Sequence, residues 1–475
     1  MDIQDMFHAC KLGDLQRLQY LVEMKEVDID TRDKWDSTPL YYACLCGHRD
    51  IVEYLLDKGA KCEANTFDGE RCLYGALTDD IRNLLKSYHV ISSRTIRREL
   101  YEEFLRRLLQ DRVYSDVVFR VHGEEFPAHR CILSARCLFF ANMFKTKWLN
   151  KPVVELNHSL MSEGAFGSIL QYLYTGSMGV SMDLVDDCLK LARQCQLYEL
   201  MTEIEDRMKK TLSWESSKPG VRVTTLVLES QGSDVLQRDL AQLAHWALPD
   251  QLNSWVVGEL PFEPESLPLS YPDICFCVQE HKFMCHKVFF CGRSDYFQAL
   301  LEDHFGECQQ GESVPTLILH DVSVDVFVRI LMYIYTDSCD LHADFVGDVL
   351  MWADMYLLPG LKRLCASSMM AYVDLSNVVS LIRTARLFNL PRLESHCAEF
   401  IANNLSKVIS QEDFKALVIE DASNVQQREE TDSIDIVDEI RFYISSFVLT
   451  YSEMEEANEK LRLIDDMLEE LDIEG

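Results

Sequence analysis

The most regular apolar pattern near the N-terminus lies between residues 36 and 60, D-S-T-P-L-Y-Y-A-C-L-C-G-H-R-D-I-V-E-Y-L-L-D-K-G-A. Thr38-Pro39-Leu40 predicts the start of a helix, because a hydroxyl caps the first turn and proline is tolerated there. Gly47-His48 predicts a tight turn between two helices. The buried face of the second helix is predicted at Ile51, Val52, Leu55 and Leu56.

The same unit recurs imperfectly on both sides. Ala9 and Gly13 precede Ala43 and Gly47 by 34 residues, and Asp36 stands where Gly69 stands in the next unit, 33 residues later. The third unit lacks the Gly-His turn, which indicates a truncated cap. The pattern resembles two to three ankyrin repeats over residues 1–90. Two or three repeats are too few to bury their apolar faces as an independent solenoid. We therefore expect them to pack against the helical residues that follow, 95–110.

A longer segment occurs twice. Residues 115–144 align without a gap with residues 272–301 at an offset of 157. In each copy, V-V-F-R-V or I-C-F-C-V predicts a buried strand, followed by a hairpin and two packed helices. The matched positions include Asp116 and Asp273, Phe119 and Phe276, His129-Arg130 and His286-Lys287, and, at an offset of 161, Tyr174 and Tyr335.

This duplicated pattern resembles the BTB/POZ domain, at residues 94–212 and 235–373, with a linker at 213–234. Residues 374–420 resemble the helical BACK extension that follows BTB domains in substrate adaptors, and 421–475 form an acidic tail. The order of these parts resembles the ankyrin–BTB–BTB adaptor family. The expected fold class is therefore multidomain α+β, with all-α ankyrin repeats, two tandem BTB/POZ domains and a BACK-like helical extension.

Charge and composition narrow the class of partner. The chain has 475 residues, 48% of them hydrophobic, and a net charge of −32, so it offers no broad basic face for nucleic acid or an anionic membrane. The N-terminus lacks the pattern of a signal peptide, and no run of 18 uncharged apolar residues occurs. The 17 cysteines are an odd number scattered through apolar stretches, which favours reduced thiols. We expect a cytoplasmic protein, with the nucleus as the alternative.

The acidic charge is concentrated at the C-terminus. Residues 420–475 carry 18 acidic and 4 basic side chains, a net of −14. Yet an apolar stripe runs through this segment at helical spacing, which favours docked or self-associating helices over a disordered tail. The stripe comprises Leu461, Ile464, Leu468 and Leu471.

The chemistry-bearing residues favour structure over catalysis. His129 and His286 lie in the duplicated motif without a nucleophile and an orienting acid at recognisable spacing, so we interpret them as structural. Cys44-x-Cys46 and Cys275-x-Cys277 each lack the second pair of ligands that a closed zinc site needs. We expect no enzyme activity, no cofactor and no metal.

The resemblance itself implies two further features. BTB adaptors that recruit cullin-3 present a hydrophobic-x-Glu element after the second helix, and Phe305 and Glu307 match it in the second domain, next to Leu301. In the first domain, Trp148 is available but Asn150 replaces the acid. A solvated acidic loop is the alternative for this short element. The family pattern also implies that Asp116 pairs with Arg130, and Asp273 with Lys287.

These observations predict a protein–protein adaptor, specifically a substrate-recruiting subunit of a cullin-3 ubiquitin ligase. The ankyrin repeats would hold a protein substrate through exposed tip residues, for which Lys34, Trp35 and Phe67 are the candidates. The BTB domains would bind cullin and associate, either as a homodimer or as a pseudo-dimer inside one chain. The alternative is a signalling or transcriptional co-regulatory scaffold that takes no part in ubiquitin transfer.

Overall fold

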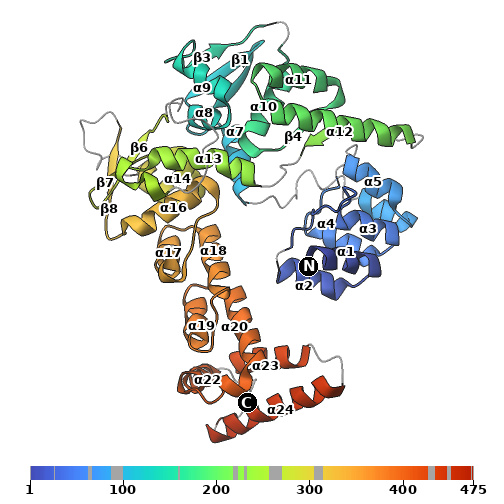
Figure 1. Cartoon of the computed structure of the whole chain (residues 1–475), viewed down its shortest axis with the longest axis vertical. Coiled ribbons are helices and arrows are strands. Elements are labelled where there is room, and N and C mark those ends of the chain that lie inside the picture. The colour runs from blue at the N-terminus through green and yellow to red at the C-terminus, as the bar shows by residue number, and fades with distance from the viewer. Residues whose placement is uncertain are drawn as a thin grey trace. The chain divides into compact units, whose positions relative to one another are not determined.

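A computed structural model describes residues 2–25, 27–62, 67–86, 100–158, 161–217, 223–228, 233–255, 270–303, 314–425, 434–446, 451–471 and 473. The chain forms two compact units. The first comprises residues 1–293, 297–321 and 334–337. The second comprises residues 294–296, 322–333 and 338–475. The boundary between the units runs through the second of the two duplicated domains. Figure 1 labels the helices and strands along the chain.

The N-terminal repeat region, residues 2–86, consists of short helices in pairs. They are α1 (Asp2–Leu12), α2 (Leu15–Glu23), α3 (Pro39–Cys46), α4 (Arg49–Asp57), α5 (Phe67–Gly75) and a helical stretch at 79–86. Thr38 caps α3 by accepting a hydrogen bond from the backbone N–H of Tyr41, and Gly47 ends the helix in the left-handed conformation. These are the roles that the sequence predicts. The four predicted apolar positions of α4 are all buried.

The first duplicated domain is built on a three-stranded sheet. β1 (Val117–Val121) pairs antiparallel with β2 (Glu124–Ala128) and parallel with β3 (Val153–Glu155), in the order β2-β1-β3. Phe119 is fully buried, and its ring packs against Phe140 at a centroid distance of 5.6 Å. The helices of this domain are α7 (Leu100–Asp111), α8 (Arg130–Arg136), α9 (Leu138–Lys145), α10 (Glu163–Thr175), the 3-10 turn Met182–Leu184, α11 (Val185–Gln194) and α12 (Tyr198–Ser217).

The second duplicated domain repeats this sheet. β6 (Ile274–Val278) pairs with β7 (His281–Cys285) and with β8 (Thr316–Leu319), in the order β7-β6-β8. Phe276 stands opposite Phe283, as Phe119 stands opposite Phe126, so the strand register confirms the predicted duplication. The helices before and after the hairpin are α13 (Ser233–Ala247), the 3-10 helix Asp250–Trp255, α14 (Lys287–Arg293), α15 (Asp295–Asp303) and α16 (Val324–Thr336).

The segment between the duplicated domains contains more regular structure than the predicted linker. Helix α12 continues to Ser217, and β5 (Thr225–Leu228) pairs antiparallel with β4 (Met178–Ser181). The reason is the alternation in T-L-V-L, which buries Leu226 and Leu228 while β4 gains a hydrogen-bonding partner. This strand ties the residues after α12 back to the first domain.

The C-terminal unit is helical over its described residues after α16. Its helices after α16 are α17 (Ala343–Met355), α18 (Pro359–Met370), α19 (Val378–Leu387), α20 (Pro391–Asn403), α21 (Leu405–Val408), α22 (Glu412–Val425), α23 (Asp435–Ser446) and α24 (Tyr451–Glu470). The acidic tail is docked, because Ile464 and Leu468 of α24 are buried and Lys415 bonds Glu470 at 3.0 Å. Across the described ranges, no helix has the length and apolar character to cross a membrane.

Candidate protein-interaction sites

A buried histidine holds together the same three elements in each duplicated domain. His129 Nδ1 lies 2.8 Å from the hydroxyl of Tyr174, and its Nε2 lies 2.8 Å from the carbonyl oxygen of Val113. His286 makes the equivalent contacts with Tyr335 and Ser270. Burial lowers the pKa of both imidazoles. Each imidazole therefore has both ring nitrogens engaged with the fold, an arrangement suited to positioning rather than to catalysis.

The predicted pairing of Asp116 with Arg130 takes a different form. The backbone N–H of Arg130, at the start of α8, donates to Asp116 Oδ1 at 2.8 Å, and the guanidinium bonds the carbonyl of Lys151 instead. The backbone N–H of Lys287 likewise donates to Asp273 at 2.7 Å. The aspartate thus binds a free N–H at the first turn of a helix, which attracts a carboxylate through both the hydrogen bond and the helix dipole.

The helix that precedes each duplicated domain packs on the other duplicated domain. Helix α13, which precedes the second domain, packs on α8 of the first domain. Its Asp239 forms an ion pair with Arg136, whose side chain is 3% exposed, and its Gln242 donates to the carbonyl of Ala135 at 3.4 Å. Burial raises the pKa of Asp239, and the neighbouring Arg136 opposes that rise. This buried charge pair fixes α13 on the first domain.

Helix α7 makes the reciprocal contact. It precedes the first domain and packs on α14 of the second as well as on α10 of its own domain (Figure 1). Phe104 meets the ring of Phe289 at 5.9 Å and lies against Gly292, while the hydroxyl of Tyr101 donates to the carbonyl of Tyr335. Arg293 stacks on Tyr101 with its guanidinium 4.6 Å from the ring centre. Helices α7 and α13 therefore each contact both duplicated domains.

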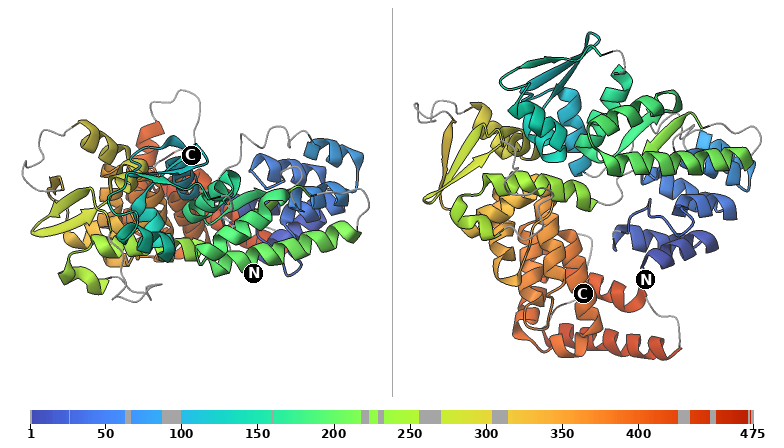
Figure 2. Two further views of the ribbon diagram at one scale, coloured as in Figure 1. Left: turned by 90° about the horizontal axis from the view of Figure 1, so that it is seen from above. Right: turned by 45° about the horizontal axis from the view of Figure 1, so that its top comes forward.

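This pairing corrects one expectation for α7. The sequence places residues 95–110 against the N-terminal repeats, but the apolar face that includes Phe104 and Leu108 packs between the duplicated domains. Residues 95–99 lie outside the described residues. The repeats instead contact α12 and β5 (Figure 2). The physical reason is that an apolar face gains more by burial between two domains than against the charged tips of the repeats.

The predicted cullin element is only partly within the described residues. Phe305 and Glu307 lie outside them. Leu301, near the end of α15, is 7% exposed, so it packs inside the protein and does not offer a surface contact. In the first domain, Trp148 is also buried, with its ring 5.5 Å from that of Phe119. The first domain therefore uses the aromatic residue at this position for its core, contrary to the availability expected for Trp148.

The three predicted tip residues of the repeats divide into two groups. Trp35 is 63% exposed, and the Lys34 ammonium lies 4.1 Å from the centre of its ring. Phe67 is half-buried and meets the ring of Trp214 at 5.8 Å, with the guanidinium of Arg207 5.5 Å away. Lys34 and Trp35 thus remain at the surface, whereas Phe67 is engaged by α12 of the first duplicated domain.

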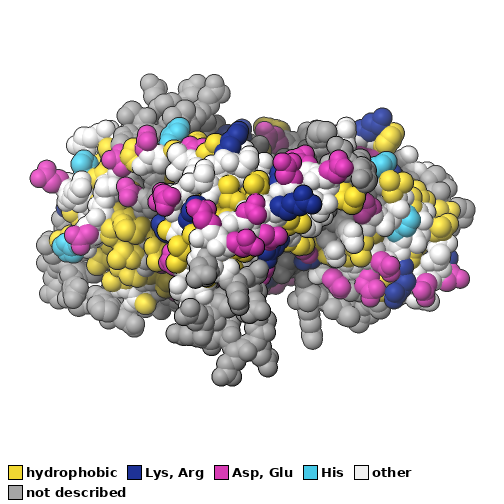
Figure 3. Space-filling view, turned by 90° about the horizontal axis from the view of Figure 1, so that it is seen from below, with side chains coloured by type: hydrophobic (Ala, Val, Ile, Leu, Met, Phe, Trp, Pro, Cys, Tyr) yellow, Lys and Arg dark blue, Asp and Glu magenta, His cyan; other side chains and the backbone are white. Residues whose placement is uncertain are grey.

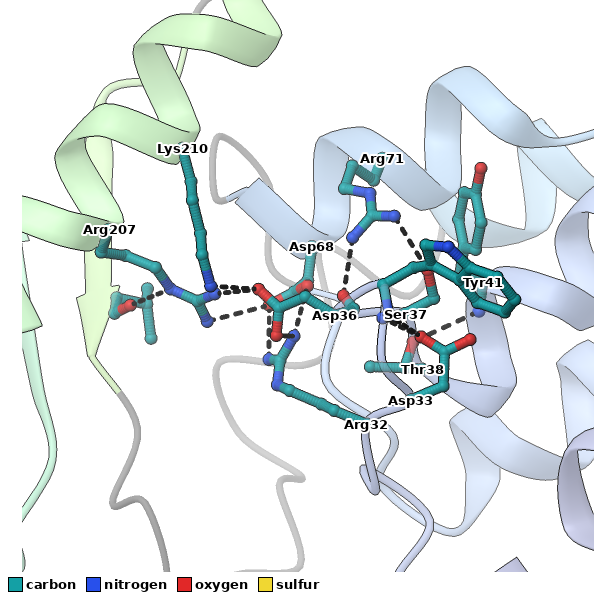
Figure 4. Close-up of polar contacts among 12 residues, drawn as sticks. Arg32, Asp33, Asp36, Ser37, Thr38, Tyr41, Asp68, Arg71, Arg207 and Lys210 are labelled. Carbon is teal, nitrogen blue, oxygen red and sulfur yellow. Dashed lines mark hydrogen bonds and ion pairs between the residues drawn. The ribbon is translucent and has the colours of Figure 1, made fainter. Parts of the chain in front are cut away.

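Acidic residues at the tips of the repeats bind basic residues of α12 (Figure 4). Arg207 Nη1 lies 2.7 Å from Asp36 Oδ2 and its Nη2 lies 4.0 Å from Asp68, and Lys210 Nζ lies 3.4 Å from Asp36. Arg32, from the repeats, binds both Asp68 oxygens at 3.0 and 2.8 Å. We call Asp36, Phe67 and Asp68 the acidic tip, and its contacts with Arg207, Lys210 and Trp214 the α12 contact.

Both partners in the central ion pair are shielded from water. The side chain of Arg207 is 13% exposed and that of Asp36 is 25% exposed. Burial alone would raise the pKa of Asp36, but the positive charges of Arg207 and Arg32 outweigh it and lower the pKa. Asp36 also has a φ of 60°, a left-handed conformation that aspartate tolerates and that fits its alignment with Gly69. The aspartate at this turn, where the next repeat has a glycine, is the feature of the sequence that could have singled out Asp36.

The surface charge, the buried cysteines and possible metal ligands of the described residues were the remaining features that could carry chemistry. On the face shown in Figure 3, acidic side chains are more widespread than Lys and Arg. Cys10, Cys44, Cys131, Cys195, Cys365 and Cys397 are all buried free thiols. Among the residues that the structure describes, no group of three His, Cys, Asp or Glu side chains is placed to hold a metal ion.

Comparison with known proteins agrees with this architecture. The family model for the BTB/POZ domain matches residues 105–212 and 264–373, and the model for ankyrin repeats matches residues 6–85 with 3 copies. BTB/POZ domain-containing protein 3 of Schizosaccharomyces pombe is 29% identical over 99% of this chain and 90% of its own length. Ankyrin repeat-containing protein YIL001W of Saccharomyces cerevisiae is 26% identical over 93% and 89%. Inhibitor of Bruton tyrosine kinase of Xenopus laevis is 23% identical over 76% of this chain and 31% of its own.

Proposed function

Because the chain belongs to the ankyrin–BTB family, with ankyrin repeats and two BTB/POZ domains, we propose that it is a substrate-recruiting subunit of a cullin-3 ubiquitin ligase. Both domain types are protein-interaction modules, so the chain is a protein-interaction adaptor. In the proposed function, the second BTB domain binds cullin-3 and the ankyrin repeats hold the protein to be modified.

The observation that carries the cullin proposal is the asymmetry between the two BTB domains. In the first domain, Trp148 is 8% exposed and the acid position is Asn150, with a φ of 56°. In the second domain, the sequence at the same offset of 157 is Phe305 followed by Glu307, directly after α15. Only the second domain carries the apolar residue and the carboxylate together. The helical extension after α18 supports the same domain as the cullin face, because it resembles the BACK extension of substrate adaptors.

We further propose that the BTB pair replaces a homodimer. Helices α7 and α13 occupy the faces of α14 and α8 from within the same chain, through Phe104 and the buried Arg136–Asp239 pair. A second copy of the chain would have to displace both helices to reach those faces. One chain therefore acts as one BTB pair with one cullin face.

The experiment is quantitative binding of the purified full chain to the N-terminal region of cullin-3. The test variant is Phe305→Ala combined with Glu307→Lys. Leu149→Ala is the matched control, because Leu149 is a 50% exposed apolar residue in the equivalent stretch of the first domain. We expect the wild type and the control to bind equally and the test variant to lose about 2 kcal/mol or more, as for the loss of a central interface residue.

Two results would overturn the proposal. One is equal binding by the test variant and the wild type, which would place the contact elsewhere. The other is no binding by a folded wild-type chain, which would leave a signalling or transcriptional co-regulatory scaffold that does not take part in ubiquitin transfer. Circular dichroism of each variant establishes that it is folded before binding is compared.

A further inference from the structure

One surface of the ankyrin repeats is already occupied by a segment of the same chain. The acidic tip faces α12, whose Arg207, Lys210 and Trp214 follow one another at intervals of three and four residues. Residues at such intervals share one face of a helix. All three make contacts with the acidic tip. Arg207 and Lys210 bind Asp36 (Figure 4), and Trp214 meets the ring of Phe67.

The complementarity is both electrostatic and apolar. Within the repeats, Arg32 pairs with Asp36 and Asp68, while Arg71 donates to the Asp36 carbonyl oxygen and to Ser37 rather than to either carboxylate. Arg207 and Lys210 supply positive charge, and Arg207 also places its guanidinium beside the Phe67 ring at 5.5 Å. Trp214 meets the same ring in a T-shaped arrangement, with the ring centres 5.8 Å apart. A charge pair with side chains 13% and 25% exposed is stronger than an open surface pair, because water screens it less.

We propose that the acidic tip is a binding site for a helix that carries arginine, lysine three residues later and an aromatic residue seven residues later, and that α12 fills this site in the free protein. The external partner is a protein segment with this basic and aromatic helical face. The inference rests on the proposed role of the ankyrin repeats as the substrate-holding part. It adds the class of segment that they recognise and a means of keeping the site closed.

Because α12 belongs to the same chain as the acidic tip, it keeps the site occupied at ordinary partner concentrations. A segment in the same chain has an effective concentration on the order of millimolar, so a partner that makes the same contacts from solution competes poorly. A partner with additional contacts, for example to the exposed Trp35, would overcome this disadvantage. Opening the α12 contact therefore raises the affinity for such partners without changing the tip itself.

The probe for this inference is a fluorescent peptide of residues 201–217, which carries the α12 face in trans. It is titrated against the full wild-type chain and against the full chain with Arg207→Glu and Lys210→Glu, which repel the tip. We expect the opened chain to bind the peptide about tenfold more tightly than wild type, or better, and Asp36→Asn in the opened chain to remove that gain. Asparagine accepts the left-handed backbone of Asp36, so this variant keeps the turn.

A second opened chain, Trp214→Ala, guards against a folding defect caused by the charge reversals, since it removes only the aromatic contact. The same peptide with Arg207→Glu and Lys210→Glu is the control ligand. The inference is overturned if neither opened chain binds the probe more tightly than wild type does, or if binding survives Asp36→Asn together with Asp68→Asn. It is also overturned if the control ligand binds equally well. Cullin-3 binding by the same opened chains is measured in parallel, so that failure of this inference is distinguished from failure of the proposed function.

Discussion

Asp36 and Arg207 are 171 residues apart in sequence, yet Arg207 donates a hydrogen bond of 2.7 Å to the Asp36 carboxylate. The pair joins a turn of the ankyrin repeats to the last helix of the first BTB domain. Because the positive neighbours lower the pKa of Asp36, the folded state favours the charged carboxylate. The pair therefore contributes stability above the unfolded pKa of about 3.9, and this contribution is lost as the pH falls through the lower folded pKa.

The pH dependence of the Asp36–Arg207 pair predicts a change in amide hydrogen exchange. At neutral pH, Asp36→Asn should increase amide exchange in α12 relative to the wild type, because the helix loses an ionic partner. The difference between the two proteins should shrink as the pH falls from about 4 through the lowered folded pKa of Asp36, since the wild-type carboxyl is neutral below that pKa. A difference that stays constant down to acid pH would show that the Asp36 charge does not hold α12.

The packing of α7 on α14 predicts that Gly292 cannot be replaced by a residue with a side chain. A methyl group at Gly292 would collide with the ring of Phe104, so Gly292→Ala should destabilise the BTB pair by about 1–3 kcal/mol, the usual cost of overpacking. Gly347→Ala is the control, because a Cβ on that helical glycine would meet no atom within 4 Å. The control should be neutral or stabilising by up to about 1 kcal/mol. Denaturant midpoints of the two variants measure the contrast, and equal midpoints would contradict the packing of α7 on α14.

The buried ion pair between Arg136 and Asp239 predicts strong coupling. Asp239→Ala leaves a guanidinium that is 3% exposed without its carboxylate and should cost about 3–5 kcal/mol. Adding Arg136→Met should recover part of that loss, because the unpaired buried charge is gone. A double-mutant cycle measured by chemical unfolding gives the coupling energy. Additive losses in the cycle would show that the two side chains act independently.

The buried imidazoles predict loss of stability in mild acid. Burial lowers the pKa of His129, so the unfolded chain takes up a proton at a higher pH than the folded chain does. The neutral histidine's contribution is present above the unfolded pKa of about 6.5 and decreases as the pH falls toward the folded pKa. We expect the denaturant midpoint of wild type to fall between pH 7 and pH 5.5, and His129→Gln to reduce that slope. An unchanged slope in the variant would exclude His129 as a source of the effect.

Much of the fold follows from local pattern and internal repetition. The offset of 157 places Phe119 and Phe276 on equivalent strands, because the same alternation and hairpin recur in both domains. The role of Thr38 as a helix cap follows from residue type alone. These predictions need only contacts that are close in sequence or copied between repeats.

The partners of the exposed faces could not be predicted in this way. The apolar stripe of α7 shows that the helix is buried but not what buries it, and it packs between the BTB domains rather than on the repeats. The acidic tip depends on Arg207, Lys210 and Trp214, which have no marked spacing relation to the repeats. Asp239 similarly resembles any charged residue of an amphipathic helix until its contact with Arg136 is known. Long-range pairing of charges is set by tertiary geometry, which residue periodicity does not encode.

We propose above that one chain supplies one internal BTB pair and one cullin face. Its most direct test is the molar mass, by light scattering during size-exclusion chromatography, of the purified chain with and without the N-terminal region of cullin-3. We expect a molar mass of 54.9 kDa for the free chain and a complex that contains one copy of each protein. A free chain of twice that mass, or a complex with two copies of each protein, would contradict the internal pair; a folded chain that forms no complex would contradict the cullin face.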